Sequence, residues 1–406
     1  MNLQYTKVGK PIRVMVVNPL LPTSQLLITK LLSGIIFGMN DFIDLILLVY
    51  SNEMRIANEY VQELTSCGFP CFNTIKATSD LPHIYDADLF CIMTNFANPN
   101  AFDFYKDSDE QFDTLYLILK IALSLGKPLT GVALQEVCKK KEEESHLHPV
   151  VVCDGFVVMD VLHSFSENVP SEVFYCATPL RSIAKTILSD YLKVQCRDIN
   201  DAYVWAVNDV DFHVEIATPY LIYDNVSRED VCDWDAMGKE VLDKLKLDHV
   251  QFNASWMKRE FIEKVASTSR ENPYGCIYRA AEVSKTIRYI FQSRSDRGEE
   301  DDLVTSLGII SDGSLGTIKG LPYILPLLIR DQQWTVNKRY EESSHLRSEI
   351  KRINLIAKEH HAQLHQYCKK FLDENITKHV FIPDVQDSES EDSFCYMGIS
   401  TRTSDS

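Results

Sequence analysis

Short apolar runs alternate with helix-like segments over the first 155 residues, and this alternation constrains the fold more than any other feature of the sequence. The first run, "IRVMVVN" at residues 12–18, is apolar on both faces, which is typical of a strand inside a parallel sheet. Similar runs are "IDLILLVY", "DADLFCIMTN" and "HPVVVCDG", and helical patterns lie between them. We therefore predict an α/β protein with a doubly wound parallel sheet.

From about residue 165 the pattern changes, because helices and strands no longer alternate strictly. Helices are predicted at "PLRSIAKTILSDYL", "SWMKREFIEKVAS" and "YRAAEVSKTIRYIF", with a strand at "AYVWAVN". A pair of strands around "LVTSLGIISDG" and "YILPLLI" follows, and a long polar helix is expected at about 341–373. We predict a doubly wound domain at 11–156, an α+β domain at 157–380, and an acidic, serine-rich disordered tail at 381–406.

Charge and cysteine usage restrict the classes of partner and the compartment. The formal net charge of −17 argues against nucleic acid and anionic membranes as partners. No apolar run reaches the roughly 18 residues of a membrane span, and the first residues lack a signal-peptide pattern. Eleven cysteines without a regular framework indicate reduced thiols and a cytoplasmic protein, with a disulfide or zinc site at Cys67 and Cys71 as the alternative.

The turn after the first strand is where a sheet of this kind binds a nucleotide pyrophosphate, with glycines letting the backbone approach the ligand. Here the turn reads "NPLLPTS" and contains no glycine. Asn18 can adopt a left-handed conformation, but the Leu21 side chain would occupy the space of a diphosphate. Pro22 fits the first turn of the helix, although it removes one N–H from the anion-binding end. The turn predicts a dinucleotide fold without an intact pyrophosphate site.

Several segments, in their order and spacing, resemble the cytosolic malate dehydrogenases of the lactate/malate dehydrogenase family, and most closely the divergent malate dehydrogenase 1B-like group. The segments are "PIRVMVV", "LLSGIIFGMNDFIDLILLV", "DADLFCIMTN", "SWMKREFIEKV" and "LVTSLGIISDGSLGTIKGLPYILPLLIRDQQWTV". The resemblance spans residues 11–373 and implies a Rossmann-like domain, a lactate/malate dehydrogenase C-terminal domain, NAD as cofactor and a homodimer.

The cofactor positions implied by this resemblance hold unsuitable residues. The three glycine or small positions fall on Asn18, Leu21 and Ser24. The acidic residue that binds the ribose hydroxyls falls on Val49, for which Ser51 or Asn52 would be weak substitutes. The cofactor-contacting asparagine falls on Asp154, which adds negative charge where an anion should bind. We therefore expect no cofactor to bind.

The catalytic positions are changed as well. Malate oxidation needs a histidine base, an aspartate that orients it, and arginines that bind two carboxylates. The resemblance places these groups at Asn208, Leu180 and Ile183, and Arg181 lies on a different helix face. The loop after "IMTN" should supply two arginines, but the chain has none between Arg55 and Arg181. Lys106 lies in that loop among Asp103, Asp107 and Asp109.

We predict a catalytically impaired malate dehydrogenase-like protein that acts as a structural or binding module. The alternative is an active NAD-dependent malate dehydrogenase with a rearranged site, in which His213 is the base and Lys106 supplies a cation. His361 and His365 have the i, i+4 spacing of zinc ligands in "KEHHAQLH", but the glutamate is not between them. We expect an exposed polar helix face there and no metal site.

Overall fold

A computed structural model describes residues 10–127, 148–216, 252–292 and 303–377, together with Asp243, Lys246 and Asp248. Within these ranges, the residues that the structure does not describe are 107, 194, 197–198, 200–201, 272–274, 331 and 339–340. The predicted tail at 381–406 therefore lies outside the described residues, as does most of the "CKKKEEESHLH" segment.

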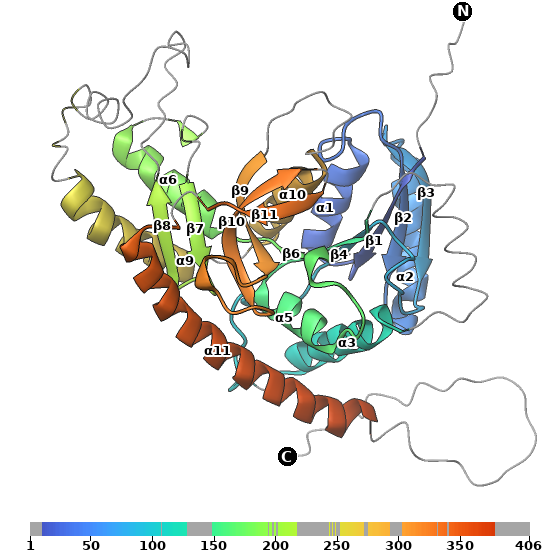
Figure 1. The fold of residues 1–406 in the computed structure, drawn as a ribbon. Coiled ribbons are helices and arrows are strands. Elements are labelled where there is room, and N and C mark those ends of the chain that lie inside the picture. Colours follow the sequence, from blue (N-terminus) through green and yellow to red (C-terminus); the bar gives the residue numbers. More distant parts are fainter. Residues whose placement is uncertain are drawn as a thin grey trace, which may run out of the picture.

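Six parallel strands form the N-terminal part of one large sheet (Figure 1). They are β1 (Ile12–Val17), β2 (Ile43–Leu48), β3 (Phe72–Thr78), β4 (Leu89–Ile92), β5 (Val150–Cys153) and β6 (Phe174–Cys176). Their order, β3-β2-β1-β4-β5-β6, is that of a doubly wound dinucleotide fold. The predicted doubly wound sheet is confirmed, and β3 and β6 are strands that the sequence pattern did not identify.

Helices cover both faces of this parallel region. α3 (Asp109–Leu125) and α5 (Phe156–Phe165) pack on one face. On the other face lie α1 (Pro22–Leu32) and α10 (Cys276–Gln292), while α2 (Met54–Ser66) packs beside β3 after the short 3-10 helix η1 (Ser51–Glu53). Pro22 occupies the first helical turn of α1, as predicted.

The C-terminal part extends the same sheet with antiparallel strands. These are β7 (Ala202–Ala206), β8 (Phe212–Ile216), β9 (Leu303–Ile310), β10 (Pro322–Arg330) and β11 (Gln333–Val336). β9 pairs with β6, and Gly308 is needed there because a Cβ atom would lie 2.0 Å from the Cys176 sulfur. The parallel sheet thus runs on to β6, and the domain boundary at 156 stays a prediction. β8 and β11 were not predicted.

The remaining elements are helical. α6 (Leu180–Leu192) packs against α9 (Phe261–Glu271), which continues a π-helix at Phe252–Glu260. Short 3-10 helices lie at Ser171–Val173 and Ser314–Gly316, and a π-helical turn at Asp373–Thr377 ends the described chain.

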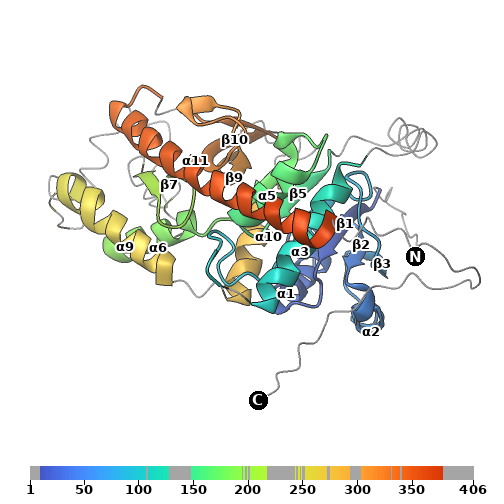
Figure 2. The same ribbon diagram turned by 90° about the horizontal axis from the view of Figure 1, so that it is seen from below.

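The long predicted helix is α11 (Ser344–Leu372), whose 29 residues span about 43 Å at 1.5 Å per residue. Ser343 caps its start by accepting a hydrogen bond from the Leu346 amide. Figure 2 shows α11 running along the molecule from the side of β7 to α3. It therefore connects the C-terminal part of the sheet with the loops that follow the parallel strands.

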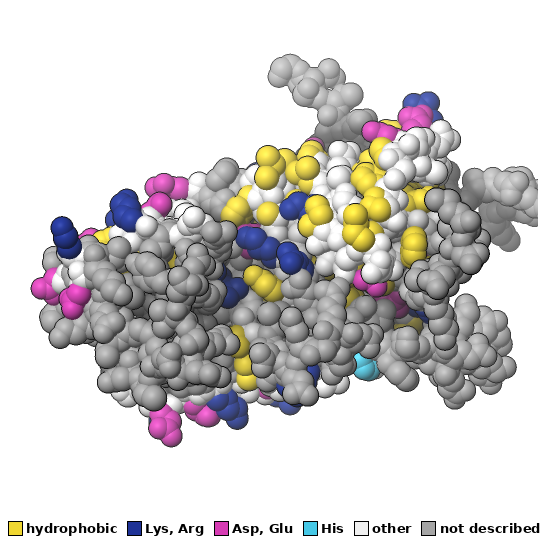
Figure 3. Space-filling model, turned by 90° about the horizontal axis from the view of Figure 1, so that it is seen from above, with side chains coloured by type: hydrophobic (Ala, Val, Ile, Leu, Met, Phe, Trp, Pro, Cys, Tyr) yellow, Lys and Arg dark blue, Asp and Glu magenta, His cyan; other side chains and the backbone are white. Residues whose placement is uncertain are grey.

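One face of the molecule carries hydrophobic and basic side chains next to each other. On the face drawn in Figure 3, hydrophobic side chains gather over one part of the molecule, next to a group of lysine and arginine side chains. Among the described residues, none of the helices is both long enough and apolar enough to cross a membrane.

Candidate functional site

The candidate site lies at the carboxyl ends of β1 and β4, where the strand order reverses and doubly wound proteins bind their ligands. Asn18, directly after β1, has a φ of 53°, so the left-handed turn predicted for it is confirmed. Its side-chain amide donates a 2.8 Å hydrogen bond to the Met93 carbonyl, just after β4. The Asn18 side chain therefore bridges the carboxyl ends of the two strands.

The residues at the start of α1, which follow Asn18 in the chain, are mostly buried. Leu21 is half-buried, and its amide donates to the Asn18 carbonyl at 3.2 Å. Thr23 and Ser24 are buried, and the Ser24 hydroxyl has no hydrogen-bond partner among the described residues. Side chains thus occupy the turn in which a pyrophosphate-binding loop would present glycine backbone.

A buried ion pair occupies the neighbouring strand ends. The Arg279 guanidinium of α10 pairs with the Asp154 carboxylate, which follows β5, and donates to the Thr94 carbonyl at 2.6 Å. A second nitrogen of Arg279 donates to the Phe96 carbonyl at 3.4 Å. The side chain of Asp154 is 0% exposed and that of Arg279 is 10% exposed. Sequence reasoning missed Arg279 altogether.

Thr94 completes this cluster from the end of β4. Its amide donates to Asp154 Oδ2 at 2.8 Å, and its hydroxyl donates to the same oxygen at 2.9 Å. Asp154 was expected to add negative charge where an anion should bind. In the structure Arg279, from the C-terminal part of the chain, pairs with this carboxylate and supplies the opposite charge.

The end of β2, where the resemblance implies a ribose-binding carboxylate, has no acidic side chain. Val49 is buried, and its amide donates to the Thr78 carbonyl of the neighbouring strand at 3.0 Å. Ser51 and Asn52 are exposed in η1. The Val49 position thus belongs to the core of the sheet.

The loop after β4 packs against its surroundings through a buried amide and an aromatic cluster. The Asn100 amide donates to Asp209 at 3.1 Å, and its oxygen accepts a 3.2 Å hydrogen bond from the Phe156 amide of α5. Phe102 and Phe104 contact Tyr367 of α11, with ring centroids 5.1 and 5.7 Å apart. This loop is therefore attached to both α5 and α11.

The charged residues predicted for this loop lie at its surface. Lys106 and Asp103 are exposed, and both donate or accept hydrogen bonds through their backbones within the loop. Asp103 Oδ1 accepts from the Tyr105 amide at 3.0 Å, and Asp109 begins α3. Asp107 lies outside the described residues.

The catalytic positions implied by the resemblance have structural roles. Asn208 closes the β7–β8 turn, because its oxygen accepts from the amides of Val210 at 2.8 Å and Asp211 at 2.6 Å. Leu180 is 0% exposed and Ile183 is buried, and both belong to one hydrophobic core.

Arg181 is adjacent to Leu180 in sequence, but its side chain is not part of this hydrophobic core and contacts other elements. Its guanidinium donates to the Ala202 carbonyl and to the hydroxyls of Tyr289 and Thr305, each at 3.3 Å. It therefore joins α6 to β7, α10 and β9.

His213, the alternative base, lies on β8 opposite Trp205. Its Nε2 is 2.8 Å from Glu215 Oε1, and its ring contacts that of His345 at the start of α11. Among the described residues, the hydrogen bond and the ring contacts of His213 are with Glu215, Trp205 and His345, and none of them is with Lys106 or Asn208.

His361 and His365 of the "KEHHAQLH" segment are half-buried, so the prediction of an exposed face was wrong for these two, whereas His360 between Glu359 and His361 is exposed. His361 Nδ1 lies 2.8 Å from Asp160 Oδ1, and this hydrogen bond raises the pKa of His361. His365 stacks on Phe165. Burial lowers the pKa of the nearby His163, whose Nε2 lies 2.9 Å from the Ser171 hydroxyl.

Comparisons with known proteins agree with this architecture. No family model matches the chain. The chain is 26% identical over 337 residues to "Malate dehydrogenase, cytoplasmic" of Rattus norvegicus, covering 80% of this chain and 89% of that one. It is 22% identical over 336 residues to "Putative malate dehydrogenase 1B" of Homo sapiens, covering 80% of this chain but only 58% of that protein.

Solved structures show the same fold. A malate dehydrogenase from Naegleria fowleri superposes with a TM-score of 0.63 at 14% identity, over 91% of this chain and 99% of that one. A Trichomonas vaginalis lactate dehydrogenase, solved with NADH and oxamate, has a TM-score of 0.62 at 13% identity, over 89% and 99% of the two chains. The predicted fold class and the resemblance are both confirmed.

Proposed function

We propose that this malate/lactate dehydrogenase-like chain is catalytically impaired, does not bind NAD in the ordinary way, and acts as a structural or binding module. The Arg279–Asp154 pair carries the proposal, because it fills the carboxyl ends of β4 and β5 with the protein's own charges. A dinucleotide that entered this region would have to displace a guanidinium held by one carboxylate and two backbone carbonyls.

Two further observations support the proposal. The Asn18 side chain links the ends of β1 and β4, across the position where such folds bind a pyrophosphate. Leu180 and Ile183 are core residues, so an aspartate and an arginine at those positions would be placed in a hydrophobic cluster. Without an oriented base and arginines for the carboxylates, malate oxidation would lack most of its positioning advantage.

The resemblance also supports a proposal about the oligomeric state and the cellular compartment of the protein. We propose a homodimer in the cytoplasm, with no nucleic acid or membrane partner. The cytoplasmic relatives match this chain over 89% of their length, which supports the compartment, and the homodimer rests on the resemblance alone.

NAD and NADH at millimolar concentration are expected to leave the melting temperature of the purified protein unchanged. A ligand present at 100 times its dissociation constant would stabilise the folded state by about 2.7 kcal/mol, which thermal denaturation detects easily. A rat cytoplasmic malate dehydrogenase measured in parallel serves as the positive control. A clear upward shift for this chain would overturn the proposal and favour the active dehydrogenase with His213 and Lys106.

Asn208→His is expected not to produce malate dehydrogenase activity. A general base is worth about 10²–10⁴ in rate, but only when it is oriented and the substrate is held. Leu180 offers the imidazole no carboxylate partner, and the loop after β4 contains no arginine. The substitution also removes the acceptor of the Val210 and Asp211 amides, so the turn should be weakened.

The measurement is oxaloacetate-dependent oxidation of NADH by wild type and mutant at equal concentration. Asn208→Ala is the matched control, because it loses the same turn hydrogen bonds without gaining an imidazole. Turnover by Asn208→His above that of both other proteins would mean that substrate and cofactor sites survive.

A further inference from the structure

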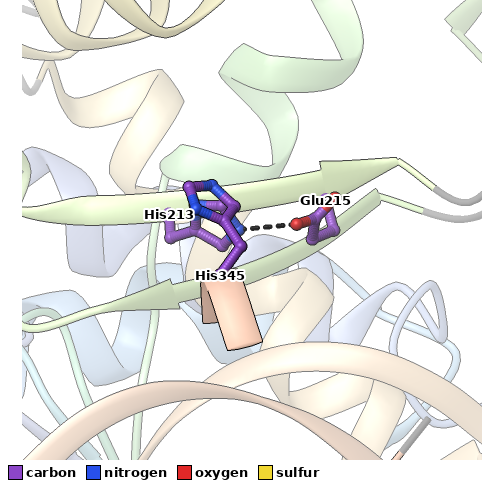
Figure 4. Close-up of side chains that lie close together, drawn as sticks. All are labelled: His213, Glu215 and His345. Carbon is purple, nitrogen blue, oxygen red and sulfur yellow. Dashed lines mark hydrogen bonds and ion pairs between the residues drawn. The ribbon is translucent and has the colours of Figure 1, made fainter. Parts of the chain in front are cut away.

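We propose that His213, Glu215 and His345 bind a transition-metal ion, with zinc as the ion that fits them best. Figure 4 shows the three side chains next to one another, two from β8 and one from the first turn of α11. One ligand atom from each residue can be chosen so that all of them lie within 4.8 Å of one another. The site is separate from the carboxyl ends of β1 and β4 and does not depend on the function proposed above.

The secondary structure places two of the ligands. His213 and Glu215 are two positions apart on β8, so their side chains leave the same face of the strand. His213 Nε2 already lies 2.8 Å from Glu215 Oε1. His213 is buried beside Trp205, with ring centroids 5.7 Å apart, which limits the positions that its imidazole can take.

The third ligand comes from a distant part of the sequence. His345 is the second residue of α11, and its ring lies 5.1 Å from that of His213 at an interplanar angle of 79°. His345 is exposed, so its side chain can change rotamer without disturbing the core. The N-terminus of α11 thus brings an adjustable imidazole to a more rigid histidine–glutamate pair.

The distances suit a small metal ion. Zinc binds imidazole nitrogen at about 2.0–2.1 Å and carboxylate oxygen at about 2.0–2.2 Å, so tetrahedral ligand atoms lie about 3.3–3.5 Å apart. His213 Nε2 and Glu215 Oε1 are 2.8 Å apart, and one ligand atom of each of the three residues lies within 4.8 Å of the others, so small side-chain adjustments are enough to reach these separations. A rotation of His345 toward β8 would bring the three atoms to coordinating distance.

The donor set indicates the class of metal. Two imidazoles and one carboxylate form a ligand set found in zinc proteins, whereas calcium and magnesium prefer sets made of oxygen alone. Three protein ligands leave the fourth tetrahedral position to water or another small molecule. The bound ion would also join β8 to α11 by direct bonds. The hydrogen bond between His213 and Glu215 does not link these two elements, because both residues lie on β8.

The test uses the full-length protein after chelator treatment, titrated with zinc and followed by calorimetry and by melting temperature. We expect one equivalent to bind and to raise the melting temperature. His345→Ala and Glu215→Gln should each weaken binding on the order of 100-fold, since loss of a supporting partner alone costs about 10–100-fold. His148→Ala, which removes an exposed histidine elsewhere, should bind as the wild type does.

Cobalt titration separates this site from binding by cysteine, because the chain has eleven cysteines. Imidazole and carboxylate ligands give cobalt weak visible bands, whereas thiolates add an intense charge-transfer band in the near ultraviolet. A circular dichroism spectrum of metal-free His345→Ala establishes that this exposed substitution leaves the fold intact. Three results would overturn the proposal. The first is that zinc does not bind saturably, and the second is that the wild type and the three variants bind it with equal affinity. The third is that cobalt gives only the charge-transfer band of a thiolate.

Discussion

Arg279→Met is expected to lower the free energy of unfolding by about 3–5 kcal/mol, the usual cost of removing one partner from a buried ion pair. The reason is the carboxylate left behind, because the side chain of Asp154 is 0% exposed and cannot be hydrated where it lies. The two donors from Thr94 would remain, but neither carries a charge. Urea denaturation followed by circular dichroism measures the change.

Two further variants show whether the unpaired charge of Asp154 causes the loss of stability in Arg279→Met. Asp154→Asn combined with Arg279→Met removes both charges and should recover much of the loss, since replacing a whole buried pair is often close to neutral. Arg55→Met alters an 88% exposed arginine whose pair with Glu59 spans 3.8 Å, and should cost at most about 1 kcal/mol. Equal losses for Arg279→Met and Arg55→Met would contradict the buried pair.

Leu180→Asp, which introduces the aspartate implied by the resemblance, is expected to destabilise the protein by about 4–5 kcal/mol or more. Truncating a buried leucine to alanine already costs about 2–5 kcal/mol, and an unpaired carboxylate adds its own desolvation. Leu180 is 0% exposed in the core that includes Ile183, Val204 and Phe212. The attempted repair of the catalytic site should therefore unfold much of the protein.

Leu180→Met provides the matched control, because a swap that preserves volume should cost less than about 1.5 kcal/mol. The comparison is made by denaturant unfolding and by the soluble fraction on expression. A Leu180→Asp protein as stable as Leu180→Met would mean that a cation or solvent reaches this position, and that the site is more enzyme-like than its burial indicates.

Much of the fold could be predicted from local patterns. The apolar runs of β1, β2, β4 and β5 are long enough to read directly, and Pro22 marks the start of α1. The missed strands have weak signals for physical reasons. β3 is an edge strand with polar, partly exposed residues, and β6 contains only three residues. Their pairing depends on neighbours that are distant in sequence.

The candidate site could be predicted only in part, because its decisive contact joins residues that are 125 positions apart. Within "YRAAEVSKTIRYIF", Arg279 has the pattern of any charged helix residue. The available signal was the aspartate at position 154, since a carboxylate at the buried end of a strand requires a cation. The same reasoning applies to Asp160 in "FVVMDVLHSF", a lone charge in an apolar helix, which pairs with His361.

The aromatic attachment of the loop after β4 has a consequence for conformational populations. Releasing the loop from α11 would separate Tyr367 from Phe102 and Phe104, two ring pairs worth about 0.5–1.5 kcal/mol each beyond their buried area. Together they make a released loop about 5–150-fold less populated than it would be without them. Any ligand that needs this loop in another position would bind with an apparent affinity reduced by the same factor, whatever contacts it then made.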